Sequence, residues 1–310
     1  MAGKMEQINN LLEYIGIRSK NYYHSARDIS YNPDNFLNYY LNQSQRALYN
    51  GPFDQMGIPL YQKKEKTDYL PVLISFYALG HLQVYLDTDN RASLDKFIKI
   101  SDWFVDQQQP DGSWLSPFPM PKFNLIDPHP SAMIQGLALS CLTRAFKITN
   151  DEKYIKSSSR ALDIFDLDIK DGGVTSDEEG IIFYEEYPSF PVKRVLNGFI
   201  YTLWGLHDLI RVNNNSRADK LYQTGLKSLE TLLPKFDMGY WSFYHISKDE
   251  LVNPAAVHYH RLHIAQLEVM HQITGNELFK EYGSKWNKYL NGRFNALRTL
   301  PSKIRWRLIS

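Results

Sequence analysis

Two adjacent glutamates lie between two tyrosines in the stretch YEEYP, residues 184–188. Adjacent side chains of an extended chain point to opposite sides, so only one of Glu185 and Glu186 can easily face a cleft. A carboxyl group in an aromatic-walled pocket has a raised pKa and can act as a general acid or base. The stretch therefore predicts one acid/base carboxylate with the phenols of Tyr184 and Tyr187 beside it.

A second group of titratable side chains lies further along the chain. Tyr244 belongs to the stretch SFY, and HYHRLH at residues 258–263 supplies a phenol, a guanidinium and three imidazoles. His260 and His263 are one helical turn apart, a spacing that can also hold a metal ion. The chain has no HExxH pattern and no set of cysteine ligands, so we expect no metal.

The elements that must position these groups recur along the chain at a spacing of roughly 60 residues. Each repeat opens with a turn of Asn, Asp, Thr or Gly that can cap a helix. An amphipathic helix follows the turn, and a strongly apolar helical run lies between successive repeats. Such helix pairs predict an all-α fold, an incomplete (α/α) toroid. An open α-solenoid would use the same pairs and is the alternative.

We expect one α/α-toroid catalytic domain over residues 1–310, with residues 1–56 as a helical extension that packs on it. In a toroid, the loops that lead into the inner helices gather at one end. Three of these loops are long and rich in aromatic and polar residues, which is typical of functional loops. They span residues 111–131, 172–193 and 238–260.

Composition excludes some classes of function. The formal charge is +1, with 35 basic and 34 acidic residues, so the chain lacks the basic field that nucleic-acid binding requires. The single cysteine, Cys141, lies in an apolar run and is interpreted as an inert core thiol. We find neither a leader-like apolar segment near the start nor an apolar run that could span a membrane, and we therefore expect a cytoplasmic protein.

Aromatic residues are abundant, with 21 Tyr, 16 Phe and 6 Trp. Aromatic faces can bind the C–H faces of sugar rings, although most of these tyrosines are expected to fill helix interfaces with the hydroxyl at the rim. An aromatic cleft that carries a carboxylate suggests carbohydrate chemistry, and composition and spacing do not choose the reaction.

Seven stretches between about Gly57 and His271 resemble, in the same order, the catalytic domain of the D-glucuronyl C5-epimerases. They are GIPLYQ, DYLPVLISFYALGH, WFVDQQQPDGSW, SAMIQGLALSCLTRAF, YEEYP, VLNGFIYTLWGLHDL and YHRLHIAQL. The family has a β-sandwich domain between the parts that match YALGH and WFVDQQ. About twenty residues separate these parts here, so the resemblance implies that the β-sandwich domain is absent.

The resemblance implies an isomerase that converts D-glucuronate to L-iduronate in a glycan of the heparosan or heparan sulfate kind. One group removes the C5 proton and a second returns a proton to the opposite face, with no cofactor. The family's acid/base pair falls on Glu186 and Tyr259, and its other active-site tyrosines fall on Tyr187 and Tyr244. Because a free phenol has a pKa of about 10, we assign abstraction to Glu186 and proton return to Tyr259. These roles exchange in the reverse direction.

The uronate carboxylate needs a cation or hydrogen-bond donors in order to take up further charge. Animal members of the family have Asp and Arg shortly after the tyrosine at Tyr244, where this chain has His245 and Ser247. We therefore expect Arg194 or Arg261 to bind the carboxylate; an exposed charge at a helix start is the alternative for Arg194. The other expected substrate-binding residues lie in matched stretches: Tyr69, Trp114, Gln135, Tyr184, Asn197 and His263.

The expected partner is a uronate-containing oligo- or polysaccharide, and formation of a homodimer is left open. Three other functions stay open as well. A polysaccharide lyase shares the proton abstraction but eliminates the C4 substituent. A glycoside hydrolase of the toroid type needs two carboxylates that flank the scissile bond. A toroid that binds glycans without catalysis is the third.

Overall fold

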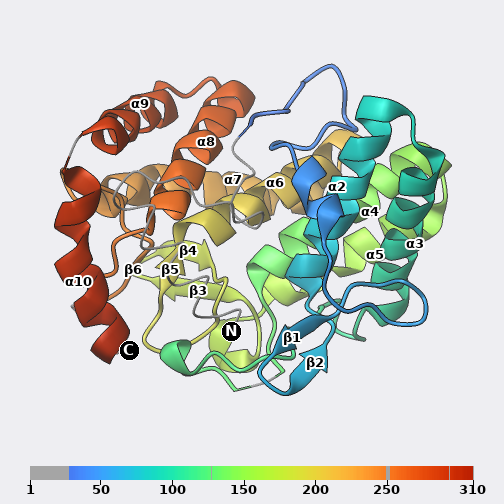
Figure 1. Ribbon diagram of the computed structural model, residues 1–310, viewed down its shortest axis with the longest axis horizontal. Coiled ribbons are helices and arrows are strands. Elements are labelled where there is room, and N and C mark those ends of the chain that lie inside the picture. Colours follow the sequence, from blue (N-terminus) through green and yellow to red (C-terminus); the bar gives the residue numbers. More distant parts are fainter. Residues whose placement is uncertain (1–27, 127, 249–251, 293, 310) are drawn as a thin grey trace.

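Four helical hairpins form a ring in the computed structural model, which describes residues 28–309 apart from residues 127, 249–251 and 293 (Figure 1). The inner helices are α2 (Pro71–Thr88), α4 (Ala132–Thr149), α6 (Leu196–Asn213) and α8 (Val257–Thr274). The outer helices are α3 (Arg91–Gln107), α5 (Glu152–Arg160), α7 (Ser216–Leu232) and α9 (Glu277–Asn291). One further helix, α10 (Asn295–Ile309), follows α9. These pairs confirm the predicted all-α architecture.

The same two-residue turn joins each inner helix to its outer helix. The first residue of the turn has a left-handed backbone, with φ of 52° at Asp89, 57° at Asn150, 52° at Asn214 and 68° at Gly275. The second caps the outer helix by accepting a hydrogen bond from a backbone N–H of the first turn; these residues are Asn90, Asp151, Asn215 and Asn276. Asn, Asp and Gly tolerate the left-handed conformation, and Asn and Asp are good caps. This requirement explains why TDN, TND, NNN and TGN mark the repeats.

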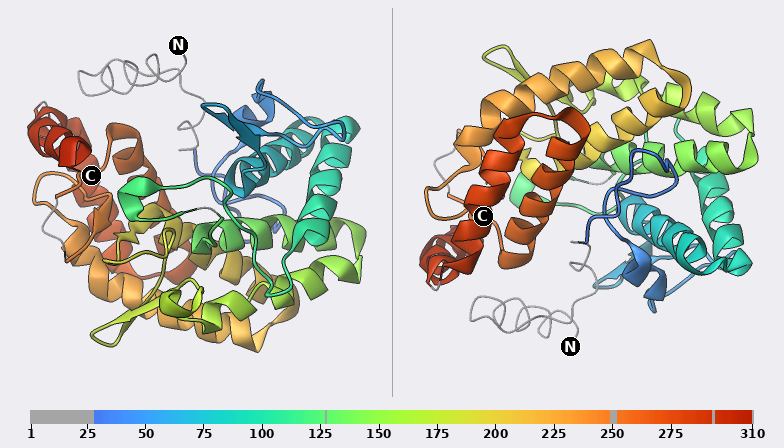
Figure 2. Two further views of the ribbon diagram at one scale, coloured as in Figure 1. Left: turned by 90° about the horizontal axis from the view of Figure 1, so that it is seen from below. Right: turned by 90° about the horizontal axis from the view of Figure 1, so that it is seen from above.

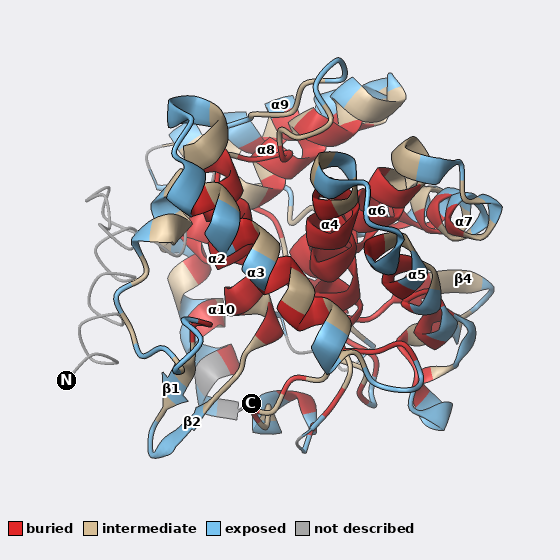
Figure 3. Cartoon of the chain, turned by 90° about the vertical axis from the view of Figure 1, so that its right-hand side faces the viewer, coloured by how far each residue is buried: buried red, intermediate tan, exposed pale blue. Residues whose placement is uncertain are grey.

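The inner helices are buried on most sides, whereas the outer helices each have one buried face. Figure 3 shows α4 and α6 buried along most of their length, while α3, α5 and α7 have both buried and exposed positions. A helix that is apolar all round belongs inside a domain, and an amphipathic helix covers it. Around the ring, α4 packs against both α2 and α6, and α6 contacts α8. Of the helices described, none has the length and apolar character that crossing a bilayer requires.

The described strands form three antiparallel pairs and no larger sheet. The pairs are β1 (Tyr61–Lys63) with β2 (Lys66–Asp68), β3 (Thr175–Glu178) with β4 (Ile181–Tyr184), and β5 (Arg194–Val195) with β6 (His245–Ile246). The last pair aligns Val195 with His245 and so joins the loop before α6 to the loop before α8. Nothing in the described part of the chain corresponds to a β-sandwich, in line with the sequence.

Residues 28–56 lie between α8 and α2, where the ring of hairpins is incomplete (Figure 2). The 3-10 helix η2 (Ser44–Leu48) is the one helical element described in this segment. The helical extension expected over residues 1–56 is therefore limited to η2 in its described half, and residues 1–27 lie outside the described residues. The segment is rich in Asn, Asp and Pro, which favour turns over helix.

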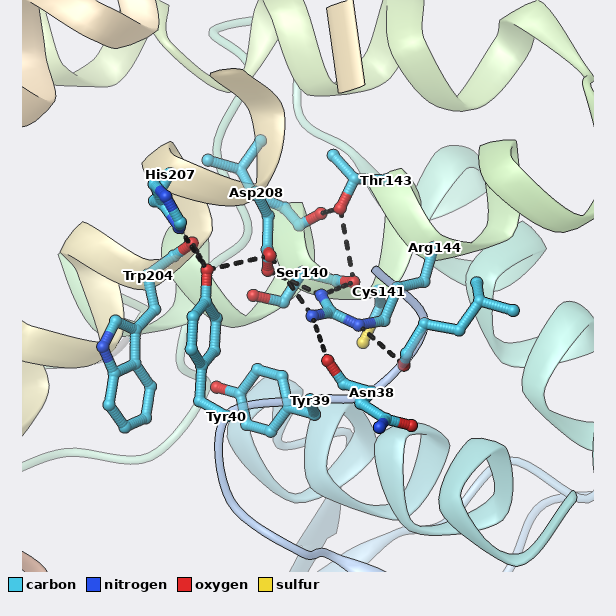
Figure 4. A network of polar contacts seen from close by, with 12 residues as sticks. Asn38, Tyr39, Tyr40, Ser140, Cys141, Thr143, Arg144, Trp204, His207 and Asp208 are labelled. Atoms are coloured by element: carbon cyan, nitrogen blue, oxygen red, sulfur yellow. Dashed lines mark hydrogen bonds and ion pairs between the residues drawn. The ribbon is translucent and has the colours of Figure 1, made fainter. Parts of the chain in front are cut away.

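A buried ion pair attaches this segment to the ring. Arg144 of α4 and Asp208 of α6 are fully buried, and Arg144 Nη1 lies 2.6 Å from Asp208 Oδ2. Arg144 also donates to the carbonyl oxygens of Leu37 and Asn38, at 3.2 and 3.1 Å. The Tyr40 hydroxyl donates to Asp208 Oδ1 at 2.9 Å (Figure 4). Two inner helices and the N-terminal segment thus share one polar network inside the core.

Candidate active site

A cavity of about 400 Å³ opens where the first two turns of the inner helices meet. Each inner helix contributes to its wall, for example through Phe76, Met133, Asn197 and Tyr259. The loops before α4 and α6 also contribute, as do strand β1 and η2. The volume lies within the range of about 300–1,000 Å³ that is usual for small-molecule sites. The loops that were expected to gather at one end of the toroid therefore do so around a cavity.

The two adjacent glutamates diverge, as the sequence predicts. Glu186 lines the cavity. Glu185 is fully buried, and its Oε1 accepts a hydrogen bond from Ser176 Oγ at 2.6 Å. The carbonyl oxygen of Glu185 accepts from the backbone N–H of Ala132 at 2.9 Å, which fixes this loop to the start of α4. Only one carboxylate of the pair can therefore meet a ligand.

Glu185 should make the stability of the protein depend on pH. Burial raises its pKa to about 8, against opposing effects of the Ser176 hydrogen bond and Arg194. The folded state keeps this proton up to about pH 8, whereas the unfolded chain releases it near pH 4.5. The stabilising contribution is complete below pH 4.5 and is lost as the pH rises to 8. Glutamine cannot ionise, so its variant escapes this loss. The unfolding free energy of Glu185→Gln minus that of wild type should therefore rise by on the order of 3 kcal/mol between pH 5 and pH 8.5. Denaturant unfolding at the two pH values measures this gain, and an equal difference at both would contradict it.

Burial also sets the protonation of Glu186, whose side chain is 7% exposed. It raises the pKa of this carboxyl to about 7, while a hydrogen bond from the Tyr187 hydroxyl opposes the rise. A group with a pKa near the working pH is present both as base and as acid, which favours general acid–base catalysis. Glu186 is thus suited to take up and release a proton at neutral pH.

Two phenols lie close to Glu186: Tyr187 is half-buried and lines the cavity, whereas Tyr244 is buried. Burial has the largest effect on the pKa of Glu186 and of Tyr187, and hydrogen bonding from Tyr187 and from Tyr244, respectively, lowers these two values. Burial, followed by the nearby Glu186 charge, raises the pKa of both phenols well above the usual value, so both keep their protons. The ring of Tyr187 stacks on Phe123 with a centroid distance of 4.1 Å. These donors support the ionised form of Glu186.

Tyr259 comes from the start of α8, on a different hairpin from Glu186. It is half-buried and lines the same cavity. Its ring packs against that of Tyr244 with a centroid distance of 4.7 Å. The pairing of β5 with β6 brings these residues together, because the N–H of Leu196 donates to the carbonyl of Tyr244 at 3.3 Å. A carboxyl group and a phenol from distant parts of the chain therefore face one space.

Of the eight predicted substrate-binding residues, Asn197 lines the cavity, and its buried Oδ1 has no hydrogen-bond partner within the described part of the chain. Four others are not among the residues that line the cavity, and each of them donates a hydrogen bond to another protein group. Their contacts are Tyr69 Oη to Asp54 Oδ2 at 2.7 Å, Trp114 Nε1 to Phe104 O at 2.8 Å, Gln135 Nε2 to Trp114 O at 3.4 Å, and Tyr184 Oη to Leu221 O at 2.8 Å.

Neither arginine that was expected to bind the carboxylate lines the cavity. The buried Arg194 is directed at the β3–β4 hairpin, where its Nη2 donates to Ile181 O at 3.1 Å and lies 3.7 Å from Glu178 Oε2. Arg261 is half-exposed on α8, two positions after Tyr259. It is not among the residues that line the cavity, although its helix neighbours His258, Tyr259 and Leu262 are. The cavity wall thus lends no support to either assignment.

The histidines at helical spacing contact protein groups. His260 Nδ1 and His263 Nδ1 lie 2.7 and 3.0 Å from Ser242 Oγ, and His260 Nε2 lies 3.0 Å from Trp286 O. Both imidazoles are buried, and neither lines the cavity. His263, which was expected among the binding residues, therefore packs within the α8–α9 hairpin. No group of three or more His, Cys, Asp or Glu side chains in the described chain could hold a metal ion.

Several polar residues of the cavity wall are not singled out by the sequence: Arg46, Tyr61, Lys63, Ser116, His129, Ser131 and Tyr201. Tyr201 follows Asn197 by four positions on α6, so helical spacing could have identified it. Arg46 and Lys63 come from the chain before α2. Their place depends on long-range contacts of this segment, which no local pattern encodes.

Comparison with known proteins matches the part of the chain that contains Glu186 and Tyr259. The family model for the C-terminus of D-glucuronyl C5-epimerases matches residues 110–288, more than half of the chain. Glu186, Tyr187, Tyr244 and Tyr259 lie inside this range. Helix α2 and Arg46 lie before it.

Two relatives and one solved structure extend this comparison. A D-glucuronyl C5-epimerase of Caenorhabditis elegans is 37% identical over 216 residues, which are 64% of this chain and 35% of that protein. An uncharacterised protein of Methanocaldococcus jannaschii is 33% identical over 180 residues, 56% of this chain and 57% of that protein. The chain thus matches only part of the length of each relative. A cellobiose 2-epimerase from Bacillus thermoamylovorans has a TM-score of 0.56 at 13% identity, covering 79% of this chain and 67% of that chain. At this identity the likeness concerns the fold alone.

Proposed function

The chain belongs to the D-glucuronyl C5-epimerase family, and from this membership and the cavity we propose that it inverts C5 of hexuronate residues in a glycan, converting D-glucuronate to L-iduronate. One observation carries the proposal. A carboxyl group and a phenol from separate hairpins, Glu186 and Tyr259, line the same cavity. Inversion at a carbon requires a proton acceptor on one face and a proton donor on the other, and these two groups can supply both.

In the proposed reaction the Glu186 carboxylate takes the proton from C5. The electron pair of the broken C–H bond spreads onto the adjacent C6 carboxylate. The Tyr259 hydroxyl then gives its proton to C5 from the opposite face, which leaves a phenolate. Exchange of protons with water returns Glu186 and Tyr259 to their starting forms. In the reverse direction each group takes the other role.

The environment of Glu186 favours proton transfer at neutral pH. A carboxyl with a pKa of about 7 is a stronger base than one with the usual value, and it is still ionised in part at neutral pH. Hydrogen bonding from Tyr187 opposes the rise that burial causes in the pKa of Glu186, so part of the carboxyl group is ionised near neutral pH. The Asn197 amide can hydrogen-bond a sugar hydroxyl or carboxylate from the same wall.

Hydrolysis of a glycosidic bond fits the cavity less well. The usual mechanism needs two carboxylates that flank the bond. Among the described residues that line the cavity, Glu186 is the one carboxylate, and Glu185 is directed at Ser176. The lining therefore favours proton transfer at carbon over hydrolysis.

Proton NMR in deuterated water tests the proposal. The protein is incubated with heparosan, unsulfated chondroitin and hyaluronan, three polymers that contain D-glucuronate. We expect deuterium to enter C5 of glucuronate in at least one polymer, together with new iduronate signals. Ultraviolet absorption of a 4,5-unsaturated product would indicate a lyase, and new reducing ends would indicate a hydrolase. Absence of exchange and of iduronate in all three would overturn the proposal.

Gly198 should be essential for this activity because the Glu186 carboxylate lies against it. A Cβ at position 198 would come within 2.3 Å of Glu186 Oε2. We expect Gly198→Ala to displace the carboxylate and to lower the rate of C5 exchange by about 10²-fold, the scale of a misplacement near 1 Å. Gly283→Ala is the control, since the nearest atom to the added Cβ would be 3.7 Å away. Equal activity of the two variants would show that the position of Glu186 does not matter.

A further inference from the structure

Two cationic side chains reach the cavity wall among the described residues, and both precede the range that the family model matches. They are Arg46 of η2 and Lys63 of β1. Lys63 Nζ donates to the carbonyl oxygen of Pro119 at 3.0 Å, which ties the β1–β2 hairpin to the loop before α4. The guanidinium carbon of Arg46 lies 4.9 Å from the centre of the Phe76 ring. The Arg46 guanidinium thus lies at the cavity wall, next to Phe76 of α2.

The fold holds Arg46 in place through close contact of η2 with α2. A Cβ at Gly80 would come within 2.7 Å of Ala47 N and 2.8 Å of Gln43 O, so η2 can approach α2 only because position 80 has no side chain. The N–H of Arg46 donates to Gln43 O at 2.7 Å. The backbone that bears Arg46 is therefore fixed against an inner helix.

Arg46 and the acid/base pair are arranged around one buried phenol, Tyr201. The Tyr201 ring contacts Phe76, with centroids 5.5 Å apart, and Arg46 covers Phe76. Burial raises the pKa of Tyr201, the charge of Arg46 opposes this, and Tyr259 and Glu186 add to it. Arg46, Glu186, Tyr201 and Tyr259 all line the same cavity. A ligand that occupies this cavity can therefore contact the guanidinium as well as the acid/base pair.

We propose that Arg46 binds the C6 carboxylate of the substrate and stabilises the charge that this carboxylate gains when the C5 proton leaves. This assignment rests on the function proposed above. A guanidinium can pair with both carboxylate oxygens at once, and a fixed cation acts most strongly where charge develops. The assignment replaces Arg194 and Arg261, which do not line the cavity. It places the recognition of acidic sugars in a segment outside the family-matched residues.

Replacement of Arg46 tests this role through turnover and through discrimination between two ligands. We expect Arg46→Gln to lower kcat/KM for C5 exchange by about 10²-fold. Arg46→Lys keeps the positive charge but cannot pair with both carboxylate oxygens in the planar geometry of a guanidinium, so it should recover part of the loss. Binding is compared by calorimetry for a heparosan oligosaccharide and for its carboxyl-reduced form. Wild type should prefer the acidic form, and Arg46→Gln should lose about tenfold of this preference.

The exposed Arg91 provides a matched control, because Arg91→Gln removes an arginine at the surface of the ring that pairs with Asp89. This variant should keep both the activity and the preference. If wild type turns over glucuronate while Arg46→Gln keeps its kcat/KM and its preference, the role of Arg46 is wrong and the proposed function stands. If no exchange occurs but the preference for the acidic ligand depends on Arg46, the proposed function is wrong and carboxylate binding stands. A wild type without any preference would overturn the role of Arg46.

Discussion

Replacement of Glu186 by glutamine should lower the rate of C5 exchange by about 10²–10⁴-fold, the usual contribution of a general base. Glutamine keeps the shape of the side chain and can still accept a hydrogen bond from Tyr187, but it cannot take up a proton at neutral pH. In the wild type, kcat/KM should rise as the pH passes through about 7, because the ionised form of Glu186 is the base. Deuterium incorporation, followed by NMR between pH 5 and pH 9, measures both effects.

Two further variants test whether the loss is specific to position 186 and whether Tyr259 has a separate role. Glu179→Gln makes the same chemical change at an exposed position of the β3–β4 hairpin and should leave the exchange rate unchanged. Tyr259→Phe should still exchange the C5 proton of glucuronate through Glu186, but it should form no iduronate because the donor on the other face is missing. If Glu186→Gln exchanges at the wild-type rate, Glu186 is not the base.

Replacement of Arg144 by methionine should lower the free energy of unfolding by about 3–5 kcal/mol, the usual cost of breaking a buried ion pair from one side. The change leaves the Asp208 carboxylate buried without its cation, and it removes the donors to the carbonyls of Leu37 and Asn38. The double replacement with Asp208→Leu should recover part of the loss, since no charge then remains in the core. Denaturant unfolding measures each free energy.

The exposed ion pairs of Arg217 serve as the control for the buried ion pair of Arg144. Arg217 lies 2.6 Å from both Asp163 and Asp166, and its side chain is 40% exposed. Exposed pairs contribute about 0–1 kcal/mol, so Arg217→Met should have a small effect despite similar distances. Equal losses for the two arginine variants would mean that burial does not decide the strength of these pairs.

The sequence predicts the helical hairpins well because the turn that ends each inner helix is formed by two consecutive residues. A left-handed residue followed by a capping Asn or Asp is visible as TDN, TND, NNN or TGN, without knowledge of the fold. The opposite directions of Glu185 and Glu186 follow from backbone geometry alone. The convergence of Glu186 with Tyr259 on one cavity is expected once the toroid is assumed, since loops before inner helices share one end.

The errors concern residues whose role depends on contacts far along the chain. The matched stretches contain Trp114 and Gln135, but these side chains bond to backbone atoms behind the cavity. Arg194 is close to Glu186 in the sequence, but its side chain in strand β5 is directed toward Glu178 and not into the cavity. Arg46 has no motif around it, and only the packing of residues 28–56 between α8 and α2 brings it to the wall. The sequence therefore identifies the residues proposed as the acid/base pair and misses the cation proposed to bind the carboxylate.

The shared polar network of Arg144 also defines the smallest piece of this chain that can be excised as a working unit. A fragment cut at residues 110–288 would retain Glu186 and Tyr259, but it would lose α2 and leave the guanidinium of Arg144 without two of its acceptors. The amino-terminal boundary of a viable truncation therefore lies no later than Leu37. The carboxy-terminal boundary lies beyond Lys303, because its Nζ donates to Asn253 Oδ1 and Pro254 O in the loop that leads into α8.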